Sequence, residues 1–297
     1  MNKNAKNLIA LAVAASLVGG GAYYLLAAKP AQQAVELEPV ATPQPVQRAV
    51  AASSAPASAA LPAILFPVPA PVQPASAAVQ ALLSLPALVD ADAVVSQQLT
   101  DLLGQKNILT FLHLDHFVRR VVATVDNMAR SYAPQTMWPV NPTPKRFVTL
   151  IDGIGGPEVI SPDNGQRYTP FVLLVESVDS AQAVALYVRL YPLFQQAYEE
   201  LGFPGRYFND RLVFVLDHLL ATPVQRGATA VSLVEVKGSV PSLRPWVRYE
   251  FTDPALEALT SGQKMLLRTG PVNQRRLNAK MLEIRALVAA AGLPAVK

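Results

Sequence analysis

The sequence contains no cysteine, which excludes disulfide bonds, thiolate metal sites, a cysteine nucleophile and a lipid anchor attached through a cysteine. Charged residues make up only 15% of the 297 residues, whereas hydrophobic residues make up 51%. A chain so poor in charge is composite, because an uncharged apolar part must dilute a more ordinary globular part. Ordinary packing must therefore hold the globular part together.

Charge is unevenly distributed, although the formal net charge is only +4. From residue 264 onward there are seven basic residues and a single acidic one. Such a basic patch could meet anionic lipid, an anionic polymer or an acidic protein, and the alternative is a solvated helix face beside an acidic neighbour. We expect no nucleic-acid partner. Four residues of the last predicted helix form the patch: Arg275, Arg276, Lys280 and Arg285.

Residues 8–28 form an apolar run long enough to cross a bilayer, since 21 residues at about 1.5 Å each span about 30 Å. Lys3 and Lys6 precede the run, and only Lys29 follows it closely. The positive-inside rule then leaves residues 1–7 in the cytoplasm and sends the rest of the chain outward. The lipid bilayer is therefore the first predicted partner. A cleaved signal peptide is the alternative reading of the same run.

Residues 29–86 read as a disordered Ala/Pro-rich linker, with eleven prolines between residues 30 and 86. Each proline removes a backbone donor and restricts its predecessor, so neither a helix nor a sheet ladder can propagate. An extended tether of this length reaches up to about 180 Å, at about 3.1 Å per residue. Residues 61–67 are unusually apolar for a linker, and either a short docking motif or incidental composition explains them.

Residues 87–297 are long enough for one substantial core. Hydrophobic periodicity and cap residues predict a mostly helical α+β domain with a small antiparallel sheet. The expected helices cover residues 90–104, 108–128, 179–202, 209–221, 254–259, 262–269 and the stretch from 271 onward. The expected strands cover residues 147–151, 171–178, 231–236 and 246–251, and a turn-rich loop is expected over 153–167.

The predicted helix 209–221 is apolar on almost every side, which is typical of a buried helix. Its charged side chains should then be paired in or near the core, with Asp217 held by Arg211 or Arg248. The alternatives are a recognition surface, or an acid/base pair such as a cell-wall hydrolase needs. The candidate residues for these roles are Arg211, Asp217, His218, Arg248 and Glu250.

Two further motifs are weak evidence for a metal site or a phosphate-binding loop. His113 and His116 have a spacing that can place two imidazoles on one metal, but on a helix Arg120 would project between them and repel the ion. The glycines of residues 153–156 follow a predicted strand, yet prolines stand where a phosphate-binding helix would have to begin. We therefore expect no metal, no cofactor and a hairpin or irregular loop over the glycines.

Three long runs resemble a known bacterial family. They are FVRRVVATVDN, YVRLYPLFQQAYEELGFPGRYFNDRLVFVLDHLLATP and WVRYEFTDPALEALTSGQKMLLRTG, which begin at residues 117, 187 and 246. Together they resemble the envelope proteins grouped as domain of unknown function 3014, over residues 108–285. An anchor and an Ala/Pro tether suit the usual layout of that family, and the resemblance supplies no catalytic residues.

An anchor, a tether and a distal domain indicate that position in the envelope is part of the function, because a tether raises the local concentration of the domain near its target. The first hypothesis is a single-pass inner-membrane protein whose periplasmic domain binds or scaffolds an envelope protein or the cell wall without catalysis. The alternative is a membrane-anchored hydrolase acting on the cell wall.

Overall fold

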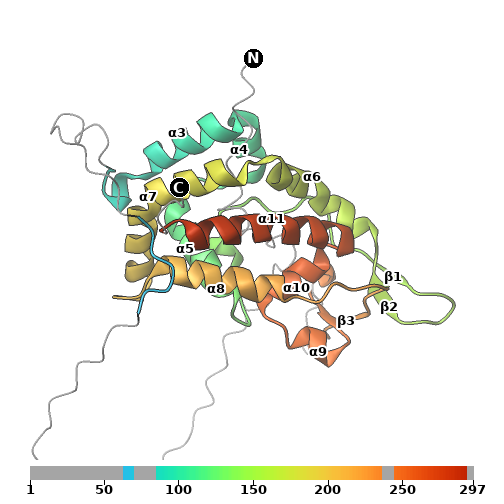
Figure 1. Ribbon diagram of the computed structural model, residues 1–297. Coiled ribbons are helices and arrows are strands. Elements are labelled where there is room, and N and C mark those ends of the chain that lie inside the picture. The colour runs from blue at the N-terminus through green and yellow to red at the C-terminus, as the bar shows by residue number, and fades with distance from the viewer. Residues whose placement is uncertain (1–62, 70–84, 236–243, 293–297) are drawn as a thin grey trace, which may run out of the picture.

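The computed structural model of the chain describes residues 63–69, 85–235 and 244–292 (Figure 1). The predicted tail 1–7, the apolar run 8–28 and most of the tether lie outside the described residues. Within the described ranges, no single helix is long and apolar enough to cross a membrane. One bent pair of helices, Asp163–Ser177 with Ser180–Glu200, passes that test only when its two members are taken together.

The domain is mostly helical and carries two small antiparallel hairpins. The α-helices of the described residues are α3 (Asp92–Leu103), α4 (Gln105–Phe111), α5 (Phe117–Met128), α6 (Asp163–Ser177), α7 (Ser180–Glu200), α8 (Phe208–Leu220), α9 (Pro254–Glu257), α10 (Ser261–Arg268) and α11 (Pro271–Ala290). Short 3-10 turns are η1 (Leu88–Asp90), η2 (Gln135–Met137) and η3 (Pro245–Val247). The strands are β1 (Thr149–Ile151), β2 (Glu158–Ile160), β3 (Val231–Leu233) and β4 (Tyr249–Phe251).

Helix α11 occupies the centre of the core, between α6 and α7 on one side and α8 on the other (Figure 1). Its apolar stripe has the 3.6-residue period of a helix that buries one face. Four side chains of this stripe have no exposed surface at all: Leu277, Met281, Ile284 and Val288. These four residues form the side of α11 that faces the core.

Helix α7 confirms the helix predicted over residues 179–202. The Asp179 carboxylate accepts hydrogen bonds from the backbone N–H of Ala181 at 2.8 Å and of Gln182 at 3.0 Å, which satisfies donors that every helix start leaves open. The helix continues through Pro192 and ends at Glu200, two residues before Gly202. Its inner face contributes a cluster of tyrosine and phenylalanine rings to the core.

The predicted strand at 171–178 is wrong, because this run forms the second half of α6. Tyr168, Val172 and Val175 are buried at helical spacing, and α6 packs against α11. Long-range packing therefore overrides the local β-propensity of a Val- and Leu-rich run. The loop expected over 153–167 contains β2 and the first turn of α6.

The sheet is also smaller than expected. β1 pairs with β2 and β3 with β4, both antiparallel, and a single bridge between Val159 and Ala230 joins the two hairpins. The glycines of residues 153–156 form the β1–β2 turn, where Asp152 N–H donates to the Pro157 carbonyl at 3.0 Å. This confirms the hairpin interpretation of the glycines.

The predicted helix 108–128 is interrupted. α4 ends at Phe111 and α5 begins at Phe117, and between them Leu112 forms a β-bridge with Val140. His116, the residue before α5, has a left-handed backbone with φ 51°. Pairing with the distant segment around residue 140 replaces the helical hydrogen bonds here, so the break could not be found from local periodicity.

Candidate functional site

A cleft of about 730 Å³ opens between the start of α5, the segment after η2 and the turn η3. Its volume is in the range of small-molecule sites. The residues that line it come from four separate parts of the sequence: His113, Arg120, Gln135, Thr136, Trp138, Val140, Asn141, Pro142, Thr143, Lys145, Phe147, Arg167, Arg244, Trp246 and Val247.

The lining is strongly cationic. It includes four side chains that are charged at neutral pH, Arg120, Lys145, Arg167 and Arg244, and it contains neither Asp nor Glu. A concave surface lined by charges of one sign concentrates the field and attracts ions of the opposite sign. The cleft therefore attracts anionic groups.

Arg167 is the buried cation of the cleft, with only 9% of its surface exposed. Its guanidinium donates to the carbonyl oxygens of Pro144 at 3.0 Å and Lys145 at 3.1 Å, and to Asn164 Oδ1 at 3.2 Å. All three acceptors are neutral. These hydrogen bonds engage Nε, Nη1 and Nη2, but the positive charge lacks an ion-pair partner among the described residues. A buried charge left in this state favours an anion nearby.

Lys145 is held in an unusual conformation beside Arg167. Its backbone lies in the left-handed region with φ 65°, which a residue with a side chain rarely adopts. The hydrogen bond from Arg167 to the Lys145 carbonyl fixes that geometry. Strained backbone of this kind persists where the surroundings over-determine it, and it clusters at ligand sites.

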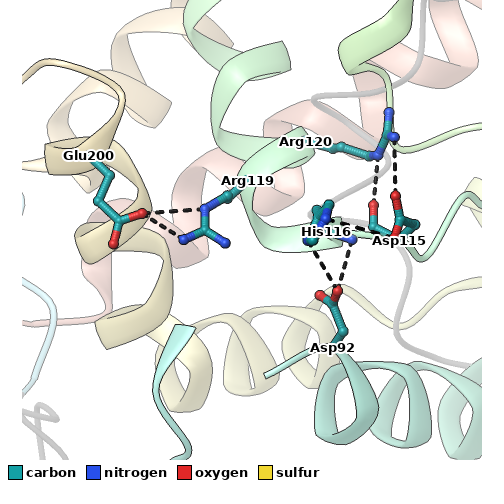
Figure 2. A network of polar contacts seen from close by, with 6 residues as sticks. All are labelled: Asp92, Asp115, His116, Arg119, Arg120 and Glu200. Carbon is teal, nitrogen blue, oxygen red and sulfur yellow. Dashed lines mark hydrogen bonds and ion pairs between the residues drawn. The ribbon is translucent and has the colours of Figure 1, made fainter. Parts of the chain in front are cut away.

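Arg120 belongs to a polar network that Figure 2 shows at close range. Its Nε donates to the Asp115 carbonyl at 2.7 Å, its Nη2 lies 3.6 Å from the Asp115 carboxylate, and its Nη1 donates to the Thr136 carbonyl. These contacts tie the start of α5 to η2 and orient the guanidinium at the edge of the cleft. Unlike Arg167, Arg120 is partly neutralised by its carboxylate neighbour.

The only two tryptophans of the chain, Trp138 and Trp246, both line the cleft. Trp138 is buried, and its indole N–H has no hydrogen-bond partner in the part of the chain that the structure describes. A buried donor without a partner is costly, so an acceptor on a bound ligand would be favourable there. The Arg146 guanidinium lies over the ring of Trp246, 4.0 Å from its centroid.

Sequence reasoning missed this cleft. Its walls join residues 113–147 to 167 and 244–247, and only the tertiary fold brings these segments together. One local signal was present, because Trp138 lies in a proline-rich passage that ends at Lys145 and Arg146, and Trp246 stands between Arg244 and Arg248. Basic residues close to both tryptophans are typical of a site for an anionic ligand.

The prediction that Arg211 or Arg248 holds Asp217 is wrong. Its carboxylate is half exposed and pairs with Arg285, whose Nε lies 2.8 Å from Oδ1. Phe214, one turn earlier on α8, is 53% exposed. The helix therefore has a solvent face despite its apolar composition, and Asp217 lies on it.

Arg211 does find a buried carboxylate, but that carboxylate is Asp126 on α5. Arg211 Nε donates to Asp126 Oδ1 at 2.9 Å and Nη2 to the Asp126 carbonyl at 2.7 Å. Arg130 donates to Asp126 Oδ2 from the other side at 2.6 Å. Asp126 is only 4% exposed, so one buried carboxylate between two arginines fastens α5 to α8.

The other three candidates do not form the buried ion pairs that the sequence suggested. His218 Nε2 lies 2.9 Å from Thr260 Oγ1, and desolvation, together with the charge of Arg211, lowers the pKa of the imidazole. Arg248 Nε and Nη1 are buried without a hydrogen-bond partner among the described residues. Glu250 is partly buried on β4 and is paired across the hairpin with Ser232.

The basic residues of α11 are mostly engaged. Arg276 lies 3.5 Å from Glu176, and Arg285 pairs with Asp217. Lys280 is buried and donates to the Val178 carbonyl at 2.9 Å, which pins α11 to the turn between α6 and α7. Arg275 is exposed. The four residues are therefore chiefly packing contacts and not one open cationic surface.

The two neighbouring histidines separate. His113 lines the cleft, whereas His116 Nδ1 lies 3.4 Å from Asp92 and its Nε2 lies 3.9 Å from Asp115 (Figure 2). The ligand atoms of Asp92, Asp115 and His116 lie within 4.8 Å of one another. The group is largely exposed, and the Arg120 guanidinium already engages Asp115. It resembles an ordinary surface network.

Comparison with known proteins identifies the family but not an activity. No curated protein and no solved structure matches the chain. A family model described as "protein of unknown function (DUF3014)" matches residues 117–285, which include most of α5 to α11 and most of the cleft lining. This match covers more than half of the 297 residues. The chain therefore belongs to the DUF3014 family.

Proposed function

We propose that this protein is a non-enzymatic binding protein of the bacterial envelope, which uses the cationic cleft to hold an anionic group of the cell wall. Residues 8–28 would anchor it in the inner membrane, with the N-terminus in the cytoplasm and the domain in the periplasm. The anchor and the topology rest on the sequence alone.

The observation that carries the proposal is the combination of Arg167, Lys145 and Trp138 in one cleft. A buried cation with only neutral partners, a strained lysine beside it and an unpartnered indole N–H all favour the same kind of ligand. That ligand carries an anionic oxygen beside an apolar group. The carboxylate-bearing peptide stems of the cell wall have this chemistry and are small enough for a cleft of about 730 Å³.

The hydrolase alternative requires two carboxylates, or a carboxylate and an imidazole, on opposite sides of a scissile bond. The cationic cleft has no carboxylate in its lining, and a second cleft of about 700 Å³ between β2, α6 and α11 has Asp152 alone. His218 contacts a threonine hydroxyl. These observations favour binding over hydrolysis.

The test is a titration of the full chain in detergent micelles with soluble cell-wall peptide fragments. Because both tryptophans line the cleft, intrinsic fluorescence reports occupancy directly. We expect saturable binding that weakens as salt is raised, since salt screens the attraction between charges. Inorganic phosphate and anionic lipid headgroups serve as competing ligands and show whether another anion source is preferred.

Lys145→Gln removes one positive charge from the cleft, and Arg275→Gln is the control that removes one positive charge elsewhere. Both side chains are exposed, but only Lys145 lines the cleft. Loss of one exposed charge contact of about 1 kcal/mol should weaken binding about fivefold. Arg275→Gln should bind as the wild type does. Equal weakening in both variants, or no saturable fluorescence change at all, would refute the proposal.

A further inference from the structure

Residues 63–69 of the tether lie against the domain, along the left side of the view in Figure 1. The contacts are made largely by the main chain. The backbone N–H groups of Leu65 and Phe66 both donate to the Asp210 carboxylate, at 3.0 Å and 2.8 Å, and Val68 N–H donates to the Tyr207 hydroxyl at 2.7 Å. The Phe66 carbonyl accepts from Asn209 Nδ2 at 2.8 Å.

The domain side of these contacts is pre-organised. Asn209 is fully buried, and its Oδ1 accepts a hydrogen bond from the Tyr187 hydroxyl at 2.9 Å. Its backbone N–H donates to the Tyr191 hydroxyl at 3.3 Å. Its amide is therefore oriented by the core and aimed at the tether segment, which is how a binding site differs from an adaptable surface.

Two side chains of the segment face the domain and the others face solvent. Phe66 and Val68 pack against the main hydrophobic core, whereas Ile64 and Leu65 are mostly exposed, at 54% and 70%. The Arg285 guanidinium lies over the Phe66 ring, 5.8 Å from its centroid. On the far side, a Cβ on Gly292 would come within 2.0 Å of the Pro67 carbonyl oxygen, so the groove needs glycine there.

We propose that this groove, between the start of α8 and the end of α11, is a binding site for an extended hydrophobic peptide interrupted by prolines, and that residues 63–69 are its resident ligand. The groove forms hydrogen bonds with main-chain groups of the extended segment and packs against one aromatic side chain. Domains that recognise proline-rich peptides bind their ligands in this way. The tether is then a strap that docks on its own domain and can be released.

Docking changes the distance that the domain can reach from the membrane. With residues 63–69 bound, residues 29–62 alone connect the anchor to the domain, and their maximum extension is about 105 Å at about 3.1 Å per residue. Release restores the full reach of about 180 Å, at about 3.1 Å per residue. The groove thus sets how far the domain extends, independently of what the cationic cleft binds.

The test is a distance measurement on the full chain in detergent micelles. Because the chain has no cysteine, Ile64→Cys and Ala286→Cys, both at exposed positions, accept one spin label each without further engineering. We expect one short, narrow distance distribution. Phe66→Ala should broaden it by removing the side chain that enters the groove, whereas the control Leu65→Ala, beside it but exposed, should leave it narrow.

A synthetic peptide of residues 61–70 tests whether the site is exchangeable. A short flexible connection gives the resident segment an effective concentration on the order of millimolar, so the peptide is added above that level. It should convert most chains to the broad distribution, and the same peptide with Phe66→Ala should not. A narrow distribution that the peptide leaves unchanged, or a broad one in the wild type, would overturn the proposal. As a further control, a mixture of the two singly labelled variants is measured. A short distance that appears in this mixture and not within one doubly labelled chain would mean that the segment of a second copy fills the groove, and it would overturn the assignment to the chain's own tether.

Discussion

The buried carboxylate of Asp126 should be the most sensitive single charge in the domain. It is held by Arg211 from α8 and by Arg130 from its own helix, and its side chain is only 5% exposed. Asp126→Asn keeps the size of the side chain but leaves two guanidinium groups without their counter-ion. Breaking a buried pair costs about 3–5 kcal/mol. The lower end, about 3 kcal/mol, applies here because Arg130 is half exposed and can recover its hydration.

The assay is thermal unfolding of Asp126→Asn beside Asp217→Asn as a control. Asp217 also pairs with an arginine, but half of its side chain is exposed, so its loss should cost at most about 1 kcal/mol. For a domain of this size, about 3 kcal/mol lowers Tm by about 6–12 °C. A drop in Asp217→Asn that equals or exceeds the drop in Asp126→Asn would show that burial does not control the energetics of these pairs.

Three further predictions concern stability and topology. Desolvation lowers the pKa of His218 in the folded domain, so the unfolded chain binds this proton more readily. The free energy of unfolding should therefore fall as pH drops below about 6.5. His218→Gln should flatten the dependence of Tm on pH between 7 and 5. Gly262→Ala should destabilise the domain by about 1–3 kcal/mol in urea unfolding, because the new Cβ would lie 2.8 Å from the Met128 carbonyl oxygen and 2.7 Å from Leu219; an unchanged midpoint would contradict this packing. Protease added to intact spheroplasts should remove the domain if residues 8–28 place it outside, and digestion only after lysis would reverse the topology.

The sequence predicted the elements whose signals are local. Asp179 marks the start of α7 because a carboxylate satisfies open backbone donors, and Gly270 precedes α11, where the buried stripe repeats at helical spacing. The local composition of the run 171–178 favours a strand, whereas the contacts that it makes as a helix are with α11, about a hundred residues later in the chain. Such contacts are invisible to any short window.

The candidate site was less predictable than the fold. Asp126 and Asp217 both lie on helices with apolar neighbours, and nothing in the sequence says which of the two faces another helix. The outcome depends on where α5 and α8 cross, which places the first carboxylate in the core and the second in solvent. The cleft around Arg167 likewise depends on the carbonyl oxygens of the loop at residues 144–145, and backbone acceptors leave no trace in a sequence.

The central position of α11 has a consequence for the order in which the protein can be made. The four side chains of its stripe lie at the contact with α6, α7 and α8, and all of these helices precede it on the ribosome. Until residues 271–290 have emerged, the parts of those three helices that face α11 stay uncovered, and the chain carries an open apolar surface. If the chain crosses the membrane with its N-terminus held back, it does so as an unfolded thread, and the domain closes only after its last core helix arrives. A nonsense codon between α8 and α11 would thus yield a chain whose apolar faces stay uncovered, a substrate for proteolysis.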